Sequence, residues 1–147
     1  MRKQFMTENQ IILVQKTWKI FRSIQPLLVG DVFYSKLFMV QPEFRKMFPV
    51  AMDEQYRKLM DMISIVVARL ERLNEVTDEI AALGKRHAGY GVKPEHYKVV
   101  GKALLWTLQQ GLGSDWTKEV EEAWTKCYTI MSDAMIQAAT EHTKNKI

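Results

Sequence analysis

The chain contains one cysteine, Cys127, among its 147 residues. A single thiol excludes an internal disulfide framework and any zinc or iron–sulfur site built from several cysteines. Long apolar runs are also missing, because the most apolar stretch, residues 62–68, is far shorter than the ~20 residues of a membrane-spanning helix. Proline and glycine are scarce, at four and seven residues, so long segments run without a turn signal.

Charge of either sign is not concentrated in this sequence. Lys and Arg outnumber Asp and Glu by 21 to 17, which gives a net charge of +4, but no block of five like charges occurs. We therefore expect solvated helix faces, with no nucleic-acid-binding surface and no membrane association. The start, Met1-Arg2-Lys3, is not followed by the ~7–15 apolar residues of a signal peptide, so we expect a cytoplasmic protein.

Apolar residues recur with helical periodicity between the turn signals, and no segment alternates as a strand does. The pattern predicts one all-α domain over residues 1–147, with a core of about 7–141, six long helices and a short one. Thr7 and Gln10 form a capping box at the first helix, and Thr77 is expected to cap a later one. The remaining helices are predicted at 26–40, 53–73, 94–111 and 117–140, with the short one at 42–48.

Among the three histidines, only His87 shares an apolar helical face, with Ile80 and Leu83. A lone inward histidine is either a satisfied core residue or a ligand, and periodicity alone favours the first. His96 begins a helix and His142 lies in a polar tail, where both are expected to be exposed. The sequence has no H-E-x-x-H and no Cys-x-x-Cys-His, so zinc is not expected and covalent haem attachment is excluded.

Tyr34 and Gln55 are polar side chains on otherwise apolar helical faces. A buried phenol or amide without a partner costs ~1–3 kcal/mol. Two interpretations remain open at this point. The pair lines a ligand site opposite an inward histidine, or the two groups hydrogen-bond each other or the backbone in an ordinary helical core.

Several short motifs along residues 7–141 resemble those of bacterial single-domain globins and of the haem domain of flavohaemoglobins. The motifs are F-Y at 33–34, Q-P-E-F at 41–44 with Phe48, Q-Y-R-K-L at 55–59, L-G-K-R-H at 83–87, K-P-E-H-Y-K-V-V-G at 93–101, and A-W at 123–124 with Tyr128. The resemblance implies a globin fold whose helices sandwich a b-type haem, iron protoporphyrin IX.

The resemblance also assigns roles to individual positions. His87 matches the proximal histidine, which is the metal ligand, and Phe48 matches the aromatic residue that wedges the porphyrin. Tyr34, Gln55 and Leu59 match the distal positions, where the phenol and the amide would donate hydrogen bonds to bound dioxygen. The same resemblance gives Tyr34 and Gln55 the catalytic roles and places Leu59 where it keeps the site dry.

Two further positions have weaker assignments. Lys58 lies beside Leu59 and pairs with a haem propionate or is simply solvated. Tyr97 matches the tyrosine behind the proximal histidine of flavohaemoglobins and is expected near the cofactor, or it is simply a packed aromatic residue. The glutamate that accompanies this tyrosine in flavohaemoglobins is replaced by Ala139 here, so strong peroxidase-like activity is not expected.

The resemblance implies dioxygen, nitric oxide and carbon monoxide as ligands. One function it implies is dioxygenation of nitric oxide, with a separate reductase because the sequence contains no Gly-rich dinucleotide motif. The alternative is non-enzymatic oxygen storage, scavenging or transport, and a gas sensor is a third, less favoured reading. Trp106, Trp116 and Trp124 lie on the last two helices, so we expect a monomer or a weak homodimer.

Overall fold

The computed structural model describes residues 6–145 and contains no strand within that range, which confirms the all-α prediction. Six α-helices and three short 3-10 helices follow one another along the chain. They are α1 (Glu8–Phe21), α2 (Pro26–Val40), η1 (Pro42–Met47), α3 (Asp53–Ala68), η2 (Leu70–Val76), α4 (Thr77–Gly89), α5 (His96–Leu112), η3 (Gly113–Asp115) and α6 (Lys118–Asn145). Of these described helices, none is both long and apolar enough to cross a bilayer.

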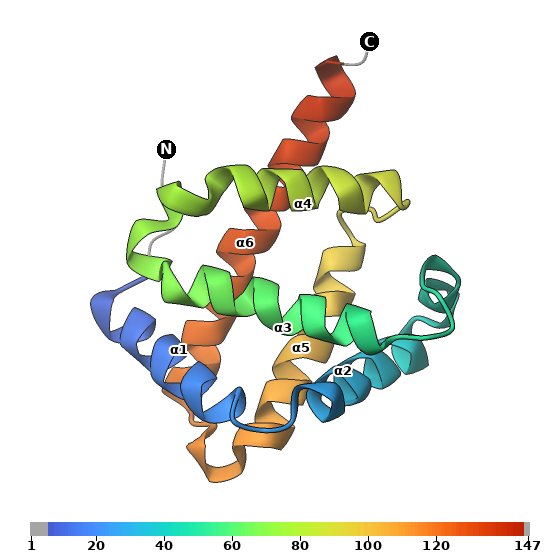
Figure 1. Ribbon diagram of the computed structural model, residues 1–147. Helices are drawn as coiled ribbons and strands as arrows, with labels where there is room; N and C mark the ends of the chain where they lie inside the picture. Colours follow the sequence, from blue (N-terminus) through green and yellow to red (C-terminus); the bar gives the residue numbers. More distant parts are fainter. Residues whose placement is uncertain (1–5, 146–147) are drawn as a thin grey trace.

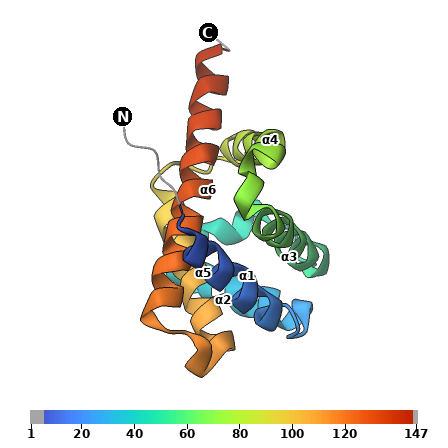
Figure 2. The same ribbon diagram turned by 90° about the vertical axis from the view of Figure 1, so that its left-hand side faces the viewer.

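The helices form two sides of the molecule (Figures 1 and 2). In the turned view, α3 and α4 lie on one side and α5 and α6 on the other, and the end of α6 extends past α4. The core at the α1 side contains Trp18 and Trp124, whose ring centroids are 5.9 Å apart. The Trp124 Nε1–H donates to Thr17 Oγ1 at 2.9 Å, so burial of this indole leaves no polar group without a partner.

Two glycines near predicted site residues allow close contacts between neighbouring helices. A Cβ atom on Gly84 of α4 would lie 2.5 Å from the Met135 carbonyl oxygen of α6. A Cβ atom on Gly30 of α2 would collide with the ring of Tyr56 on α3. Because Gly84 is three residues before His87, and Gly30 is four residues before Tyr34, both close approaches lie one turn from a predicted site residue.

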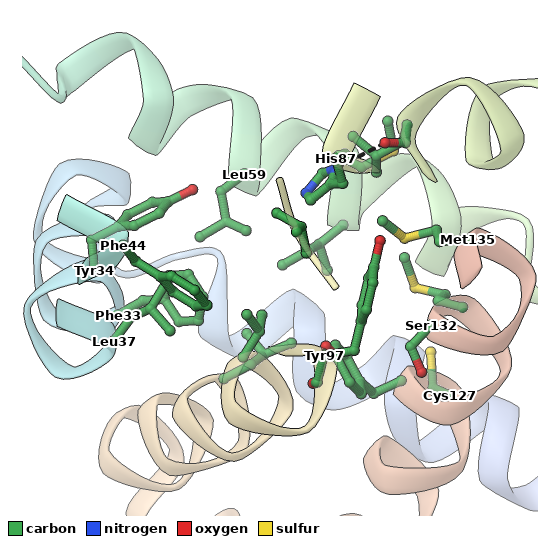
Figure 3. Close-up of a pocket in the computed structure, with 18 of the residues that line it drawn as sticks. Phe33, Tyr34, Leu37, Phe44, Leu59, His87, Tyr97, Cys127, Ser132 and Met135 are labelled. Carbon is green, nitrogen blue, oxygen red and sulfur yellow. Dashed lines mark hydrogen bonds between the residues drawn. The ribbon is translucent and has the colours of Figure 1, made fainter. Parts of the chain in front are cut away.

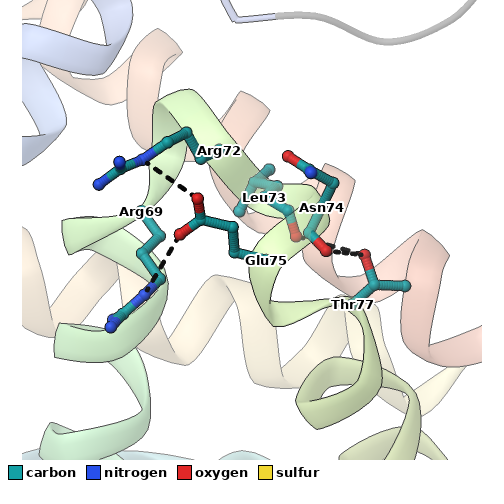
Figure 4. A network of polar contacts seen from close by, with 6 residues as sticks. All are labelled: Arg69, Arg72, Leu73, Asn74, Glu75 and Thr77. Carbon is teal, nitrogen blue, oxygen red and sulfur yellow. Dashed lines mark hydrogen bonds and ion pairs between the residues drawn. The ribbon is translucent and has the colours of Figure 1, made fainter.

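The predicted helix at 53–73 ends earlier than its periodicity indicated. α3 stops at Ala68, and Arg69 and Arg72 adopt non-helical backbone angles, with φ −118° and −140°. Glu75 then binds both arginines, at 4.0 Å from Arg69 Nε and 3.6 Å from Arg72 Nε (Figure 4). The apolar pattern continues through this break because Leu70 and Val76 are still buried, so periodicity alone could not show it.

Helix starts were predicted correctly at α1 and wrongly at α4. The capping box is present, with Gln10 N–H donating to Thr7 Oγ1 at 3.0 Å and Thr7 N–H to Gln10 Oε1 at 2.9 Å. Thr77 is instead the first residue of α4, and its hydroxyl donates back to the carbonyls of Leu73 and Asn74, both at 3.3 Å (Figure 4). The preceding 3-10 turn supplies acceptors for that hydroxyl, so Thr77 does not cap the helix.

Candidate functional site

A cavity of about 1100 Å³, its open mouth included, lies between α2, α3, α4, α5 and α6 (Figure 3). Its surface is almost entirely apolar. We call one side the tyrosine wall, which consists of Phe33, Tyr34, Leu37, Phe44, Phe48 and Leu59. We call the other side the histidine wall, which consists of Leu83, His87, Tyr97, Tyr128, Ser132 and Met135.

His87 is an imidazole side chain that lines this cavity from α4. Its Nδ1 lies 2.7 Å from the Leu83 carbonyl oxygen one turn earlier on α4. A carbonyl only accepts, so Nδ1 carries the hydrogen and Nε2 keeps its lone pair. Burial lowers the pKa of His87 below its ordinary value of 6.5, which keeps the imidazole neutral at neutral pH. The imidazole is therefore held in a fixed orientation, is neutral, and has a lone pair on Nε2.

The rest of the histidine wall contains phenols and a thioether, and no carboxylate lines the cavity among the described residues. The ring of Tyr97 lies 6.3 Å from that of His87, centroid to centroid. The Tyr128 hydroxyl donates to the Tyr97 carbonyl at 2.6 Å, which joins α6 to the first turn of α5. Burial raises the pKa of both tyrosines, so both phenols stay protonated at neutral pH. On α6, Ser132 and Met135 complete this wall.

On the tyrosine wall, Tyr34 is 5% exposed and reaches the cavity from α2. The Gln55 Nε2–H donates to the Tyr34 hydroxyl oxygen at 3.0 Å. Since that bond uses a lone pair of the oxygen, it leaves the phenolic proton free to be donated elsewhere. Burial raises the pKa of Tyr34, so the phenol keeps this proton at neutral pH. Gln55 itself is half-buried and does not line the cavity.

Aromatic rings surround Tyr34 on its other sides. Ring centroids lie 4.8 Å away for Phe33, 5.4 Å for Phe48 and 5.7 Å for Tyr56, which stacks on Tyr34 from α3. Arg45 of η1 fixes the segment that carries Phe48, because its Nη1 donates to the carbonyls of Phe48 and of the next residue at 3.2 and 3.0 Å. The position of the phenol is therefore determined by packing as well as by Gln55.

The structure brings together five of the seven predicted site residues. His87, Tyr34, Phe48, Leu59 and Tyr97 all line the cavity, and Figure 3 shows Tyr34 and His87 approaching it from different helices. The two predicted residues that do not line it are Gln55, which lies behind Tyr34, and Lys58, whose side chain is 67% exposed and lies 3.9 Å from Glu54. The pairing of Lys58 with a haem propionate stays a prediction.

The sequence contained a signal for residues that were not predicted to line the site. Cys127, Met131 and Met135 are spaced four residues apart on α6 and all line the cavity, as do Tyr128 and Ser132, again four apart. Side chains at this spacing share one face of a helix. None of these five residues was among the predicted site residues, so this face of α6 was missed.

The residues present fit an iron porphyrin. Apolar walls suit a flat macrocycle, and the macrocycle itself supplies four of the iron's donors, so the protein needs to provide only a nitrogen such as His87 Nε2. Over the described part of the chain, no three His, Cys, Asp or Glu side chains gather as they would around a bare metal ion.

Comparison with known proteins gives relatives that are much longer than this chain and relatives of about its length. The flavohemoprotein of Bacillus subtilis (strain 168) is 30% identical over 134 residues, which cover 85% of this chain and 34% of the relative. The neuroglobin-1 of Oncorhynchus mykiss is 28% identical, and the match covers 96% of this chain and 97% of the relative. This chain thus spans about a third of the length of its flavohemoprotein relatives.

Solved structures show the same fold. A bacterial globin from Campylobacter jejuni superposes with a TM-score of 0.83 at 23% identity, covering 94% of this chain and 99% of that one. A flavohemoglobin from Malassezia yamatoensis with bound FAD and haem gives a TM-score of 0.75 at 19% identity, covering 92% of this chain and 37% of that one. Together with the apolar cavity and its single imidazole, the flavohemoprotein relatives support haem binding. The sequence profile of the globin family matches residues 31–135, and the chain therefore belongs to the globin family.

Proposed function

We propose that residues 1–147 form one globin domain that holds haem b through His87 and converts nitric oxide and dioxygen to nitrate with electrons from an external reductase. The observation that carries this proposal is the Tyr34 phenol, held at 3.0 Å by Gln55 in an apolar cavity with one neutral imidazole on its other wall. Such a site combines one metal-ligating nitrogen with one hydrogen-bond donor and little other polarity.

The cavity side chains have distinct roles in this proposal. His87 Nε2 ligates the iron, and the Leu83 carbonyl fixes the orientation of the ring through Nδ1. Phe48 and Leu59 pack against the macrocycle and exclude water from the gas-binding side. Haem, when bound, supplies an open coordination position for a diatomic gas and the redox chemistry of iron.

Tyr34 is the residue proposed to hold dioxygen in place. A hydrogen bond to a charged or strongly polarised acceptor contributes about 1.5–3 kcal/mol. At ~1.4 kcal/mol for each factor of ten, one such bond slows gas release by roughly 10–100-fold. Gln55 acts through Tyr34, because its amide donates to the phenol oxygen and does not line the cavity. In this proposal only Tyr34 donates a hydrogen bond directly to dioxygen, whereas the family resemblance assigns that role to both Tyr34 and Gln55.

We propose dioxygenation of nitric oxide in particular because this reaction requires dioxygen that is held tightly. Slow release is poor for delivery and favourable for a reaction with a second gas molecule. Repeated turnover also needs an electron donor, and the structure of the flavohemoglobin of M. yamatoensis has bound FAD as well as haem. We assign the donor role to a separate reductase.

A second function, oxygen storage or scavenging without turnover, is favoured by one feature of the histidine wall. The described residues place no carboxylate in the cavity, so His87 has a backbone carbonyl as its partner and is not polarised by a negative charge. A less basic imidazole suits reversible gas binding.

One experiment separates the two functions. The reduced, haem-loaded protein is saturated with dioxygen and mixed with nitric oxide, with and without NADH and a flavin reductase. The proposal expects one equivalent of nitric oxide consumed without the reductase and sustained nitrate production with it. Consumption that stops at one equivalent, although the reductase has returned the iron to the ferrous state, overturns the enzyme and leaves a scavenger.

A further inference from the structure

A second hollow lies on the surface between α1 and α3. We call it the α1–α3 groove, and its lining consists of Gln15, Trp18, Lys19, Arg22, Ser23, Ser64, Val67 and Ala68. Val67 belongs to the lining of both this groove and the central cavity. The residue is 4% exposed, so it is a buried position that the two hollows share. We call Val67 and the side chains packed beside it the partition between the groove and the cavity.

The two tryptophans of the core complete this partition. Trp18 lines the α1–α3 groove and Trp124 lines the central cavity, and their ring centroids are 5.9 Å apart at an angle of 56°. Direct contact between the rings leaves no further layer of side chains between groove and cavity. The partition is therefore one residue thick at Val67 and two rings thick beside it.

The helices that form the groove are joined there by two side-chain hydrogen bonds. Gln15 Nε2 donates to the Val67 carbonyl at 3.0 Å, and Trp18 Nε1 donates to Ser64 Oγ at 3.0 Å. α3 ends at Ala68, so the Val67 carbonyl belongs to the last turn, where helical carbonyls lack regular partners. The partition thus lies at the end of a helix, where its backbone is held by Gln15 rather than by a continuing helical ladder.

We infer that the α1–α3 groove is an entry route for apolar diatomic gases, which cross the partition at Val67 to reach the central cavity. The inference rests on the proposed gas-binding function. A diatomic gas needs no hydrogen-bond partner inside the protein, whereas a polar or charged molecule crossing the same apolar partition loses several kcal/mol of hydration. Protein interiors are close-packed, so passage requires a transient displacement of the Val67 isopropyl group or the Trp18 ring.

The competing route is the mouth of the central cavity, where Met47 lines the cavity and is 36% exposed. A substitution that fills the groove from the solvent side discriminates between the routes without touching the gas-binding side chains. Ala68 is suitable, because it is exposed and lines only the groove. Ile65 is the matched control, since it lies on the same helix, is 39% exposed and lines neither hollow.

The experiment is flash photolysis of the carbon monoxide complex of the haem-loaded, reduced protein. Ala68→Trp is expected to lower the bimolecular association rate constant by about threefold or more, as a higher entry barrier requires. Ile65→Trp is expected to leave that rate constant at the wild-type value. The absorption spectrum of the complex and its thermal dissociation equilibrium should be the same in all three proteins, because a route changes rates in both directions equally.

A second variant is designed to lower the entry barrier instead of raising it. Val67→Ala removes two methyl groups between the hollows and is expected to raise the association rate constant by about threefold. Equal rate constants in wild type, Ala68→Trp and Val67→Ala overturn the route and assign entry to the mouth. If the wild-type protein loads haem but binds no carbon monoxide, the proposed gas-binding function is wrong. If it binds carbon monoxide and the three association rate constants are equal, only the entry route is wrong.

Discussion

The two walls of the central cavity are held in place by different kinds of hydrogen bond. On the tyrosine wall, the phenol of Tyr34 is positioned by the side chain of Gln55 and by packed aromatic rings. On the histidine wall, the ring of His87 is positioned by the backbone carbonyl of Leu83, and Tyr128 donates to the backbone carbonyl of Tyr97. Tyr34 is therefore held by another side chain, whereas His87 is held by a backbone carbonyl of its own helix.

This difference affects how easily a single substitution changes each wall. A single substitution can remove a side-chain donor, but no substitution short of a helix break removes the Leu83 carbonyl. We therefore expect the tyrosine wall to tune how long a gas stays bound. The histidine wall should respond strongly only to the loss of His87 itself.

The largest effect is expected from His87→Ala, which removes the proposed iron ligand from the histidine wall. The variant should lose haem on gel filtration, and added imidazole should restore the absorption spectrum by replacing the missing ring. His96→Ala is the control, since His96 bonds the Lys93 N–H at 3.0 Å and does not line the cavity. Normal haem retention by His87→Ala, or haem loss by His96→Ala alone, contradicts the assignment.

The next effect is expected on the tyrosine wall. Tyr34→Phe removes the phenolic donor and keeps the ring packed among its neighbours, so oxygen should dissociate roughly 10–100-fold faster. Stopped-flow replacement of oxygen by excess carbon monoxide measures this rate. Carbon monoxide dissociation is the internal control, because this ligand is a weaker hydrogen-bond acceptor and should change much less. An unchanged oxygen rate means that Tyr34 does not hold the ligand.

A smaller effect on the same wall is expected from Gln55→Leu. Gln55 acts through the phenol of Tyr34, so its loss frees the phenol to rotate without removing the donor. The oxygen dissociation rate should rise, by less than in Tyr34→Phe. In the Tyr34→Phe background, Gln55→Leu should add nothing, because residues that share one bond are not additive. Additive effects of the two substitutions would instead give Gln55 its own contact with the ligand.

The sequence predicted more of the cavity than of the interactions inside it. Helical faces placed Tyr34, Leu59 and His87 toward a common interior, because periodicity reports which side of a helix is buried. It does not report what a buried polar atom bonds. For that reason the sequence left open whether Tyr34 and Gln55 line a ligand site or hydrogen-bond each other, and only the structure shows the 3.0 Å bond between them.

Other failures of the sequence prediction have the same origin. The end of α3 at Ala68 depends on local backbone angles at Arg69 and Arg72 and on a bridging Glu75, none of which interrupts the apolar pattern. The bond between Gln15 and the Val67 carbonyl joins residues 52 positions apart, and no local pattern encodes such a pair.

Arg45 supports the tyrosine wall from outside the cavity, because it binds the segment that carries Phe48. We expect a moderate loss of stability when Arg45 is replaced. Its guanidinium binds the carbonyls of Phe48, Pro49 and Val50 and lies 5.5 Å from the centroid of the Phe38 ring. Arg45→Gln should lower the free energy of unfolding by about 1–2 kcal/mol, since bonds to charged donors contribute more than neutral ones and this group is only half-buried. Urea unfolding measures the change.

Lys46→Gln is the control for Arg45, because it removes the same charge from the next residue, which is exposed. Its unfolding free energy should match that of the wild type within about 0.5 kcal/mol. Equal losses of unfolding free energy in both variants would attribute the effect to net charge. The hydrogen bonds of Arg45 would then not stabilise the tyrosine wall.

The smallest effect is expected beside the histidine wall, at high pH. Burial raises the pKa of the Cys127 thiol from 9.0 to about 12, so above pH 9 the unfolded chain loses this proton while the folded protein keeps it. Stability from this group is fully present below pH 9 and is lost progressively as pH rises toward 12, by about 1.4 kcal/mol between pH 8 and pH 10. Urea unfolding at both pH values should show that extra loss in the wild type and not in Cys127→Ala. Parallel losses would mean that water reaches the thiol, and the cavity beside His87 would then be wetter than its apolar lining requires.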